Sequence, residues 1–188
     1  MKRSFALLFC IIFSSSIYAQ NWASSEASCY AKGNFNISAG LGIGWLGFFV
    51  IGEYGINDAI SASIATGYQG YGYSTWWRYN YVPIVARAAF HPFNLKALSN
   101  KIPIRNKLDP YAGLAMGWHI GWATELEEIK ELNDTWFGDA IDNSKPKVGH
   151  FTFRELIGVK FYPTEKFFLT AEEGGGLSWI NLGVGFKF

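Results

Sequence analysis

The chain has 188 residues, of which 49% are hydrophobic and 18% aromatic, and its formal net charge is only +1. This length suits a single domain, and the balanced charge argues against a basic surface of the kind that binds nucleic acid. The two cysteines are too few for a disulfide scaffold or a cysteine metal site, so we expect no metal and no cofactor.

The first 19 residues have the pattern of a secretory signal peptide. Lys2 and Arg3 precede the apolar residues 5–13, and small residues then lead to Ala19. The apolar run is about half as long as a membrane-spanning helix requires. We therefore predict cleavage after Ala19 and a single domain at residues 20–188, in which Cys29 has no second cysteine to pair with.

Eight segments then alternate apolar residues with small or polar ones, which is the pattern of a β-strand with one apolar face. In chain order they are residues 34–45, 48–56, 59–70, 80–90, 110–124, 150–162, 166–177 and 180–188. Most of them have the ~9–11 residues that a tilted transmembrane strand needs. An even number of such strands closes a small barrel.

Three residues conflict with regular alternation. Pro83 has no N–H to give to a neighbouring strand, so we expect a bulge or irregular pairing there. Glu155 and Glu173 fall on the apolar face, and we expect a β-bulge to reset the alternation near Glu155. The connection at residues 91–109 is also long for a periplasmic turn.

The residues opposite the apolar face indicate which side points outward. They are mostly Gly, Ala, Ser and Asn, which suit the crowded interior of an eight-stranded barrel, whereas a water-soluble barrel would carry many Lys, Glu and Thr there. Aromatic residues near strand ends resemble interfacial girdles; they are Trp45, Tyr54, Tyr68, Trp118, Trp122, Tyr162 and Trp179. The pattern predicts an all-β fold, an eight-stranded antiparallel transmembrane up-and-down β-barrel.

The last strand, residues 180–188, alternates without exception and ends on an aromatic residue. It resembles the closing strand of bacterial outer-membrane barrels, whose carboxy-terminal Phe is an assembly signal. The resemblance implies that Phe186 and Phe188 are recognised by the barrel-assembly machinery. Pairing of this strand with residues 34–45 would remove both edges of the sheet.

Four further segments resemble the small outer-membrane β-barrel proteins common in Bacteroidetes, which have barrels of the OmpA, OmpX and OmpW type. The segments are residues 52–58, 87–91, 108–114 and 169–174. The resemblance extends over essentially all of residues 20–188. It implies a monomer in the outer membrane of a Gram-negative cell, in contact with lipid and lipopolysaccharide, and it names no reaction.

Six ionisable residues have the strand parity of the inner face: Glu53, Arg87, His119, Arg154, Lys160 and Glu172. An unpaired charge in a narrow lumen is costly. We therefore predict a polar network that plugs the barrel, and with it a structural or surface-binding role. The alternative is a narrow porin-like channel for small solutes, which would conduct in planar bilayers.

A lipid A-modifying enzyme is a second alternative, because some small outer-membrane barrels are deacylases that use Ser, His and Glu on the outer face. His150, Thr152 and Glu155 are the nearest approximation here. No serine follows two residues after His150, and His150 and Glu155 have opposite strand parity. We therefore predict that the protein is not an enzyme.

Two connections carry residues that a ligand might contact. Residues 125–142 are acidic, and the alternatives are a divalent-cation surface and a solvated face. Residues 71–78 are rich in Tyr and Trp, and the alternatives are a ligand-binding rim and a continuation of the aromatic girdle.

Overall fold

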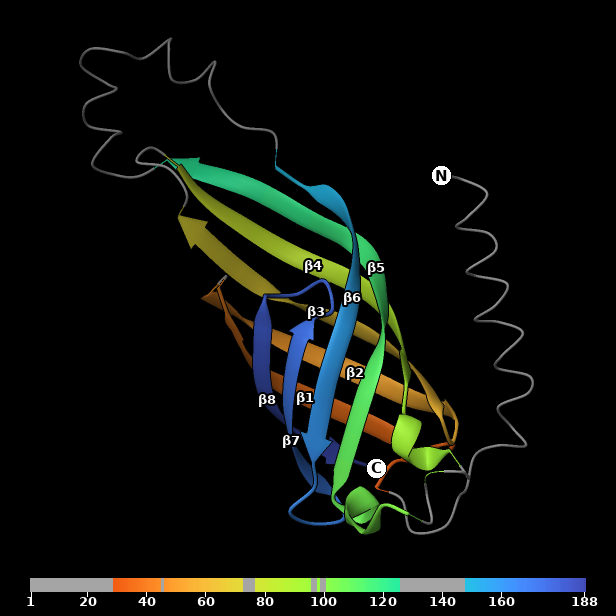
Figure 1. Ribbon diagram of the computed structural model, residues 1–188. Coiled ribbons are helices and arrows are strands. Elements are labelled where there is room, and N and C mark those ends of the chain that lie inside the picture. The colour runs from red at the N-terminus through yellow and green to blue at the C-terminus, as the bar shows by residue number, and fades with distance from the viewer. Residues whose placement is uncertain (1–28, 45, 73–76, 96–97, 99–100, 126–147) are drawn as a thin grey trace, which may run out of the picture.

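Strand pairing closes the chain into a barrel (Figure 1). The computed structural model describes residues 29–44, 46–72, 77–95, 98, 101–125 and 148–188. In these residues each strand runs antiparallel to its neighbours in sequence, and β1 completes the circle by pairing with β8. The strands are β1 (Phe35–Ile43), β2 (Leu46–Asn57), β3 (Ile60–Gly72), β4 (Trp77–Phe90), β5 (Leu108–Glu125), β6 (His150–Phe161), β7 (Phe167–Gly174) and β8 (Ile180–Lys187).

The predicted fold class is confirmed, and so is the predicted closure by the last strand. Ile37 lies opposite Phe186 and Ile43 opposite Ile180, so the β1–β8 ladder covers most of both strands. The backbone N–H of Phe188 donates to the carbonyl oxygen of Phe35 at 2.8 Å and extends the pairing beyond β8. No strand in this ladder is left as a free edge.

The irregular pairing expected at Pro83 is confirmed, whereas the β-bulge expected near Glu155 is absent. Pro83 lies opposite His119 in the β4–β5 ladder, but the β3–β4 ladder is interrupted at Val82 and Pro83 and resumes without a shift of register. Glu155 lies opposite Leu114 in an uninterrupted β5–β6 ladder and is exposed on the outer face. A shift of register lies instead between Gly55 and Asn57 of β2.

The two faces of the wall differ as the alternation predicts. Large apolar residues such as Leu41, Ile64 and Trp118 are exposed outward. Inside, a buried cluster fills the middle of the lumen; it comprises Phe49, Ile51, Ala65, Val85, Ala89, Tyr111, Ala115, Leu156 and Leu177. Side chains therefore fill the barrel, as in other small barrels.

The aromatic girdle agrees with the sequence in part. Tyr54, Trp122 and Trp179 are exposed on the outer face. Tyr162 is instead 2% exposed and packs inside against Phe168 and Cys29, so its place in the girdle was a wrong prediction. Trp45 lies outside the described residues, as do residues 1–28, 73–76 and 126–147, where the signal peptide and most of both long loops were predicted.

We call the end of the barrel that holds Phe188 the base, and the opposite end the rim. The long β4–β5 connection lies at the base and contains two short 3-10 helices, η1 (Pro92–Asn94) and η2 (Pro103–Asn106). Each begins with a proline, whose missing N–H removes one of the donors that the start of a helix leaves unpaired. No helix among the described residues is long and apolar enough to cross a membrane.

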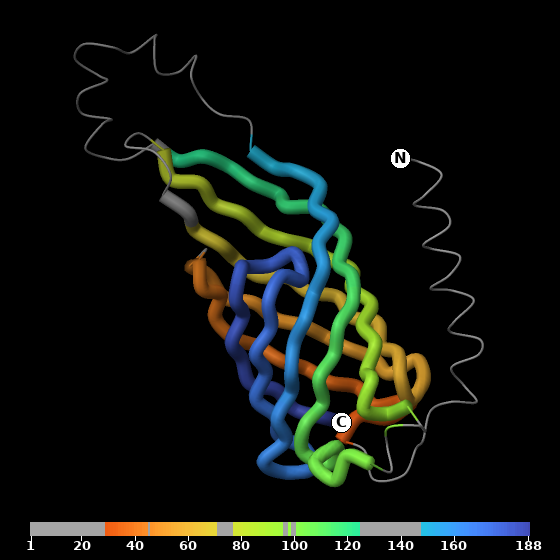
Figure 2. Tube along the Cα trace, in the orientation of Figure 1, coloured from red at the N-terminus to blue at the C-terminus, as the bar shows by residue number. Residues whose placement is uncertain are grey.

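The wall has unequal height at the rim (Figure 2). The β7–β8 hairpin, dark blue, ends well below the ends of β4, β5 and β6. The β5–β6 ladder extends to His150, whereas the β6–β7 ladder begins only at Leu156. Residues 150–155 of β6 therefore border a gap in the wall, which we call the notch.

Candidate functional site

Two ion pairs cross the lumen. Arg87 of β4 pairs with Glu172 of β7, and Lys160 of β6 pairs with Glu53 of β2. Their side chains are between 2% and 7% exposed. Because each pair joins strands that are not neighbours in the sheet, the pairs tie opposite walls together.

Tyr111 lies between the two ion pairs. Its hydroxyl donates to Oε2 of Glu172 at 2.9 Å, and Nζ of Lys160 is 5.0 Å from the centre of its ring. A cavity beside these residues has a volume of only about 10 Å³, which is about the space that one water molecule occupies. The lumen at this level is therefore filled by paired polar groups.

The β7–β8 connection folds into the barrel above the ion pairs. Gly174, Gly175 and Gly176 all have left-handed backbone angles, with φ of 77°, 69° and 72°, a region in which glycine is strongly favoured. A side chain at Gly175 would collide with the Glu172 carboxylate, and one at Gly176 would lie 3.1 Å from Val85. We call residues 174–178 the glycine turn.

Hydrogen bonds to three other strands hold the glycine turn in place. Nε2 of His119 donates to the carbonyl oxygen of Gly176 at 2.8 Å, and Gln69 donates to the carbonyl of Leu177. The Ser178 hydroxyl donates to the carbonyl oxygen of Ile43 at 2.7 Å. The sequence predicted a strand as far as residue 177, and the structure corrects that prediction by ending β7 at Gly174.

Five of the six predicted lumen residues are buried. Glu53, Arg87, Lys160 and Glu172 form the two ion pairs, and His119 is hydrogen-bonded to the glycine turn. Arg154 differs from the expectation, since it is exposed at the notch and lies outside the paired network. The reason is the short β7, which ends below the level of Arg154.

A buried cluster at the base was not predicted from the sequence. Oγ of Ser61 is 3.0 Å from Nε2 of His91, whose Nδ1 is 2.9 Å from both carboxylate oxygens of Asp109. The ring of Tyr30 stacks on His91 with 3.8 Å between the ring centres. The three side chains are thus within hydrogen-bond reach in the order of a serine–histidine–aspartate triad, in which His takes the proton of Ser and Asp orients the His.

Burial nevertheless separates this base cluster from any substrate. Ser61, His91 and Asp109 are 1%, 0% and 2% exposed. Burial also raises the pKa of the Tyr30 phenol and raises that of the Cys29 thiol to about 12, with Asp109 contributing to both shifts. The cluster therefore serves in this conformation as a hydrogen-bonded closure of the base.

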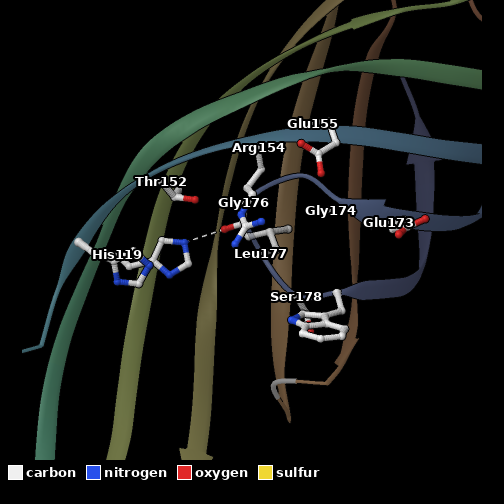
Figure 3. Close-up of a pocket in the computed structure, with 11 residues that line it drawn as sticks. His119, Thr152, Arg154, Glu155, Glu173, Gly174, Gly176, Leu177 and Ser178 are labelled. Carbon is white, nitrogen blue, oxygen red and sulfur yellow. Dashed lines mark hydrogen bonds between the residues drawn. The ribbon is translucent and has the colours of Figure 1, made fainter. Parts of the chain in front are cut away.

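The notch contains a cavity of about 220 Å³. Figure 3 shows Arg154 reaching from β6 toward Gly176 and Leu177 of the glycine turn, with Glu155 and Glu173 to one side. His119 and His150 line the same cavity, with 4.7 Å between their ring centres. Among the described residues, no group of three or more His, Cys, Asp or Glu side chains is arranged to hold a metal ion.

The residues of the enzyme alternative also lie at the notch. His150, Thr152 and Glu155 line the cavity together with Ser178. The Ser178 hydroxyl donates to the carbonyl oxygen of Ile43. The cavity thus offers charges and hydrogen-bonding groups from several strands.

The fold, rather than the sequence, relates this chain to known proteins. No family model matches the sequence, and no curated protein is similar to it. The outer membrane protein OprG from Pseudomonas aeruginosa matches with a TM-score of 0.60 at 10% identity, over 86% of this chain and 98% of OprG. The chain has the fold of an outer-membrane barrel.

The attachment invasion locus protein Ail of Yersinia pestis is also similar, with a TM-score of 0.50 at 17% identity. The match covers 84% of this chain and 99% of Ail. At these identities the likeness to OprG and Ail concerns the architecture of the barrel, and the resemblance to Bacteroidetes proteins stays a prediction.

Proposed function

We propose that this chain is an integral protein of the bacterial outer membrane, with the rim outside the cell and the base in the periplasm. The apolar outer face carries this proposal, because exposed side chains such as Leu41, Ile64, Leu182 and Val184 would be unfavourable in water and favourable in lipid. The barrel-assembly machinery would recognise β8, and lipid and lipopolysaccharide would surround a monomer.

Outer-membrane fractionation followed by gel electrophoresis tests this location. We expect a folded band that shifts after boiling, found in the outer-membrane fraction. A band in the soluble fraction with no shift on boiling would contradict the proposal.

Within the membrane, the proposed role is structural or surface-binding rather than conduction. The observation that carries it is the filled lumen, in which the Arg87–Glu172 and Lys160–Glu53 pairs lie below the inward-folded glycine turn. A solute would have to displace both the ion pairs and the glycine turn to pass through the barrel. The notch combines exposed charges with a cavity at the rim, which makes it the proposed contact surface.

Planar-bilayer recording tests the closed lumen. Protein that shows the heat-dependent gel shift should give no steady conductance. Stable channels of nanosiemens size would contradict the proposal and favour the porin-like alternative.

A further inference from the structure

The long β4–β5 connection carries charge of one sign at the base. Residues 91–108 contain four Lys or Arg residues and no Asp or Glu. Among the basic residues that the structure describes in this stretch, Lys101 and Lys107 are exposed and Arg105 is half-buried. The connection is therefore a basic segment at the end of the barrel that is proposed to lie in the periplasm (Figure 1).

Exposed residues recur at every third position of this segment. The backbone N–H of Lys101 donates to the carbonyl oxygen of Leu98, and that of Lys107 to the carbonyl oxygen of Ile104, both at 2.9 Å, so each bond spans three residues. Side chains three residues apart lie above one another in such 3-10 turns. Leu98, Lys101, Ile104 and Lys107 therefore share one side of the segment, and all four are exposed. We call these four residues the base stripe.

The opposite side of the segment packs on the barrel. Ile102, Arg105 and Leu108, which are again three residues apart, are less exposed than the base stripe. The carbonyl oxygen of Arg105 accepts a hydrogen bond from the backbone N–H of Cys29 at 3.5 Å and another from its thiol at 3.2 Å. These contacts hold the segment against the base, so the base stripe points away from the protein.

We propose that the base stripe binds an anionic phospholipid of the periplasmic leaflet. Lysines interspersed with large apolar residues on one side are typical of an element that lies in the membrane interface. Lys101 and Lys107 would contact the headgroup phosphate. Leu98 and Ile104, which are 37% and 50% exposed, would lie against the upper acyl chains and leave water. The inference rests on the proposed membrane location and orientation.

The net charge of the headgroup should decide which phospholipid binds. Phosphatidylethanolamine would bring its ammonium next to the two lysines, and residues 91–108 offer no carboxylate that could accept a hydrogen bond from it. Phosphatidylglycerol has the phosphate without this cation. The cell wall also carries carboxylates, but its polar glycan would leave Leu98 and Ile104 in water. An anionic phospholipid is therefore the occupant that matches both the charge and the apolar residues.

Native mass spectrometry of the protein in detergent micelles measures which lipid remains bound. With phosphatidylglycerol and phosphatidylethanolamine supplied in equal amounts, we expect at least about fivefold more phosphatidylglycerol to be retained, since one basic residue beside anionic lipid contributes about that factor. Equal retention of the two lipids, or an excess of phosphatidylethanolamine, would overturn the proposal.

Three variants locate the site. K101Q/K107Q should remove the preference for phosphatidylglycerol, whereas I104S should lower the retention of both lipids alike because it removes an apolar contact. K32Q/K166Q is the matched control: it removes the same charge from two exposed lysines at the base, outside the base stripe, and should keep the preference. An equal loss in K32Q/K166Q and K101Q/K107Q would show a diffuse effect of charge and overturn the site.

Two further measurements separate the ways in which the proposal could fail. The heat-dependent gel shift of each variant verifies folding, so failure of the barrel is distinguishable from failure of the site. Sedimentation with purified cell-wall sacculi tests the other occupant. Binding to sacculi that K101Q/K107Q abolishes, together with equal retention of the two lipids, would assign the base stripe to the cell wall and overturn the assignment to a lipid.

Discussion

Nε2 of His119 lies 2.8 Å from the carbonyl oxygen of Gly176, so a side chain of β5 holds the connection between two strands on the other side of the lumen. This contact fixes the height of the glycine turn above the Arg87–Glu172 pair. It also places one edge of the notch, because Gly176 lines that cavity. The filled lumen and the gap in the wall therefore depend on the same short turn.

The Arg87–Glu172 pair should be strongly coupled. Replacement of either partner alone leaves a buried charge, so R87M and E172M should each lower the free energy of unfolding by about 3–5 kcal/mol. The double variant R87M/E172M should lose less than the sum of the two, which a double-mutant cycle in urea measures. R78M is the control, since Arg78 is exposed, and it should have little effect. Additive losses would show that the two side chains do not interact.

Gly175 should tolerate no side chain. G175A would cost about 1–2 kcal/mol for the left-handed backbone alone, and its methyl group would meet the Glu172 carboxylate. The expected result is a lower unfolding midpoint in urea. The control is G70A, because a methyl group at Gly70 has its nearest neighbours at 3.9 Å. Equal midpoints for G175A and G70A would contradict the inward placement of the turn.

Much of the barrel was predictable from the sequence because alternation is a local property. Each strand of residues 34–188 carries its own two-residue pattern, and the predicted bounds differ from the observed bounds by few residues. The glycine turn was not predictable in this way, since three successive glycines carry no pattern of faces. The Ser61–His91–Asp109 cluster was missed because only the pairing of β3, β4 and β5 brings these residues together.

The notch was missed for a different reason. Alternation places Arg154 on the inner face and Glu155 on the outer face, but it says nothing about the height of the neighbouring strand. Only the ladder between β6 and β7, which begins at Leu156, shows that both residues lie beside a gap. A β-bulge was therefore expected where the structure has a shorter wall.

Ser61 should be chemically inert in the folded protein. Its hydroxyl is buried beneath the Tyr30–His91 stack, so a fluorophosphonate probe should not label it. S61A should instead lower the unfolding free energy by about 1–3 kcal/mol, because His91 loses a buried hydrogen-bond partner. Labelling that disappears in S61A would contradict the structural role and revive the enzyme alternative.

The Cys29 thiol should react slowly with thiol reagents at neutral pH. Burial raises its pKa from the ordinary 9.0 to about 12, with Asp109 adding to the shift. The folded state therefore favours the neutral thiol. The resulting contribution to the free energy of unfolding is complete below pH 9 and is lost as the pH rises toward about 12.

Reaction with a disulfide reagent in a C10S background measures this difference. The folded protein should react far more slowly at pH 8 than the chain in denaturant, because the thiolate is the reactive form. Similar rates in both states would show that Cys29 is accessible.

Phe188 should be required for closure. Its N–H donates to Phe35 at 2.8 Å, and its ring lies 6.4 Å from that of Phe35 between ring centres. Deletion of Phe188 should reduce the heat-shifting band in outer membranes, whereas F188Y should preserve it because the backbone bond and the ring remain. Normal assembly of the deletion variant would show that β8 closes the barrel without this residue.

The inward fold of the glycine turn has a practical consequence for surface display. A peptide epitope inserted after Gly175 would have to replace packed groups inside the lumen, next to Glu172 and Val85. Antibodies added to intact cells would then find no exposed tag there, even though this connection joins two strands at the end that is proposed to face outward. Short connections in barrels of this kind are therefore not interchangeable as insertion points.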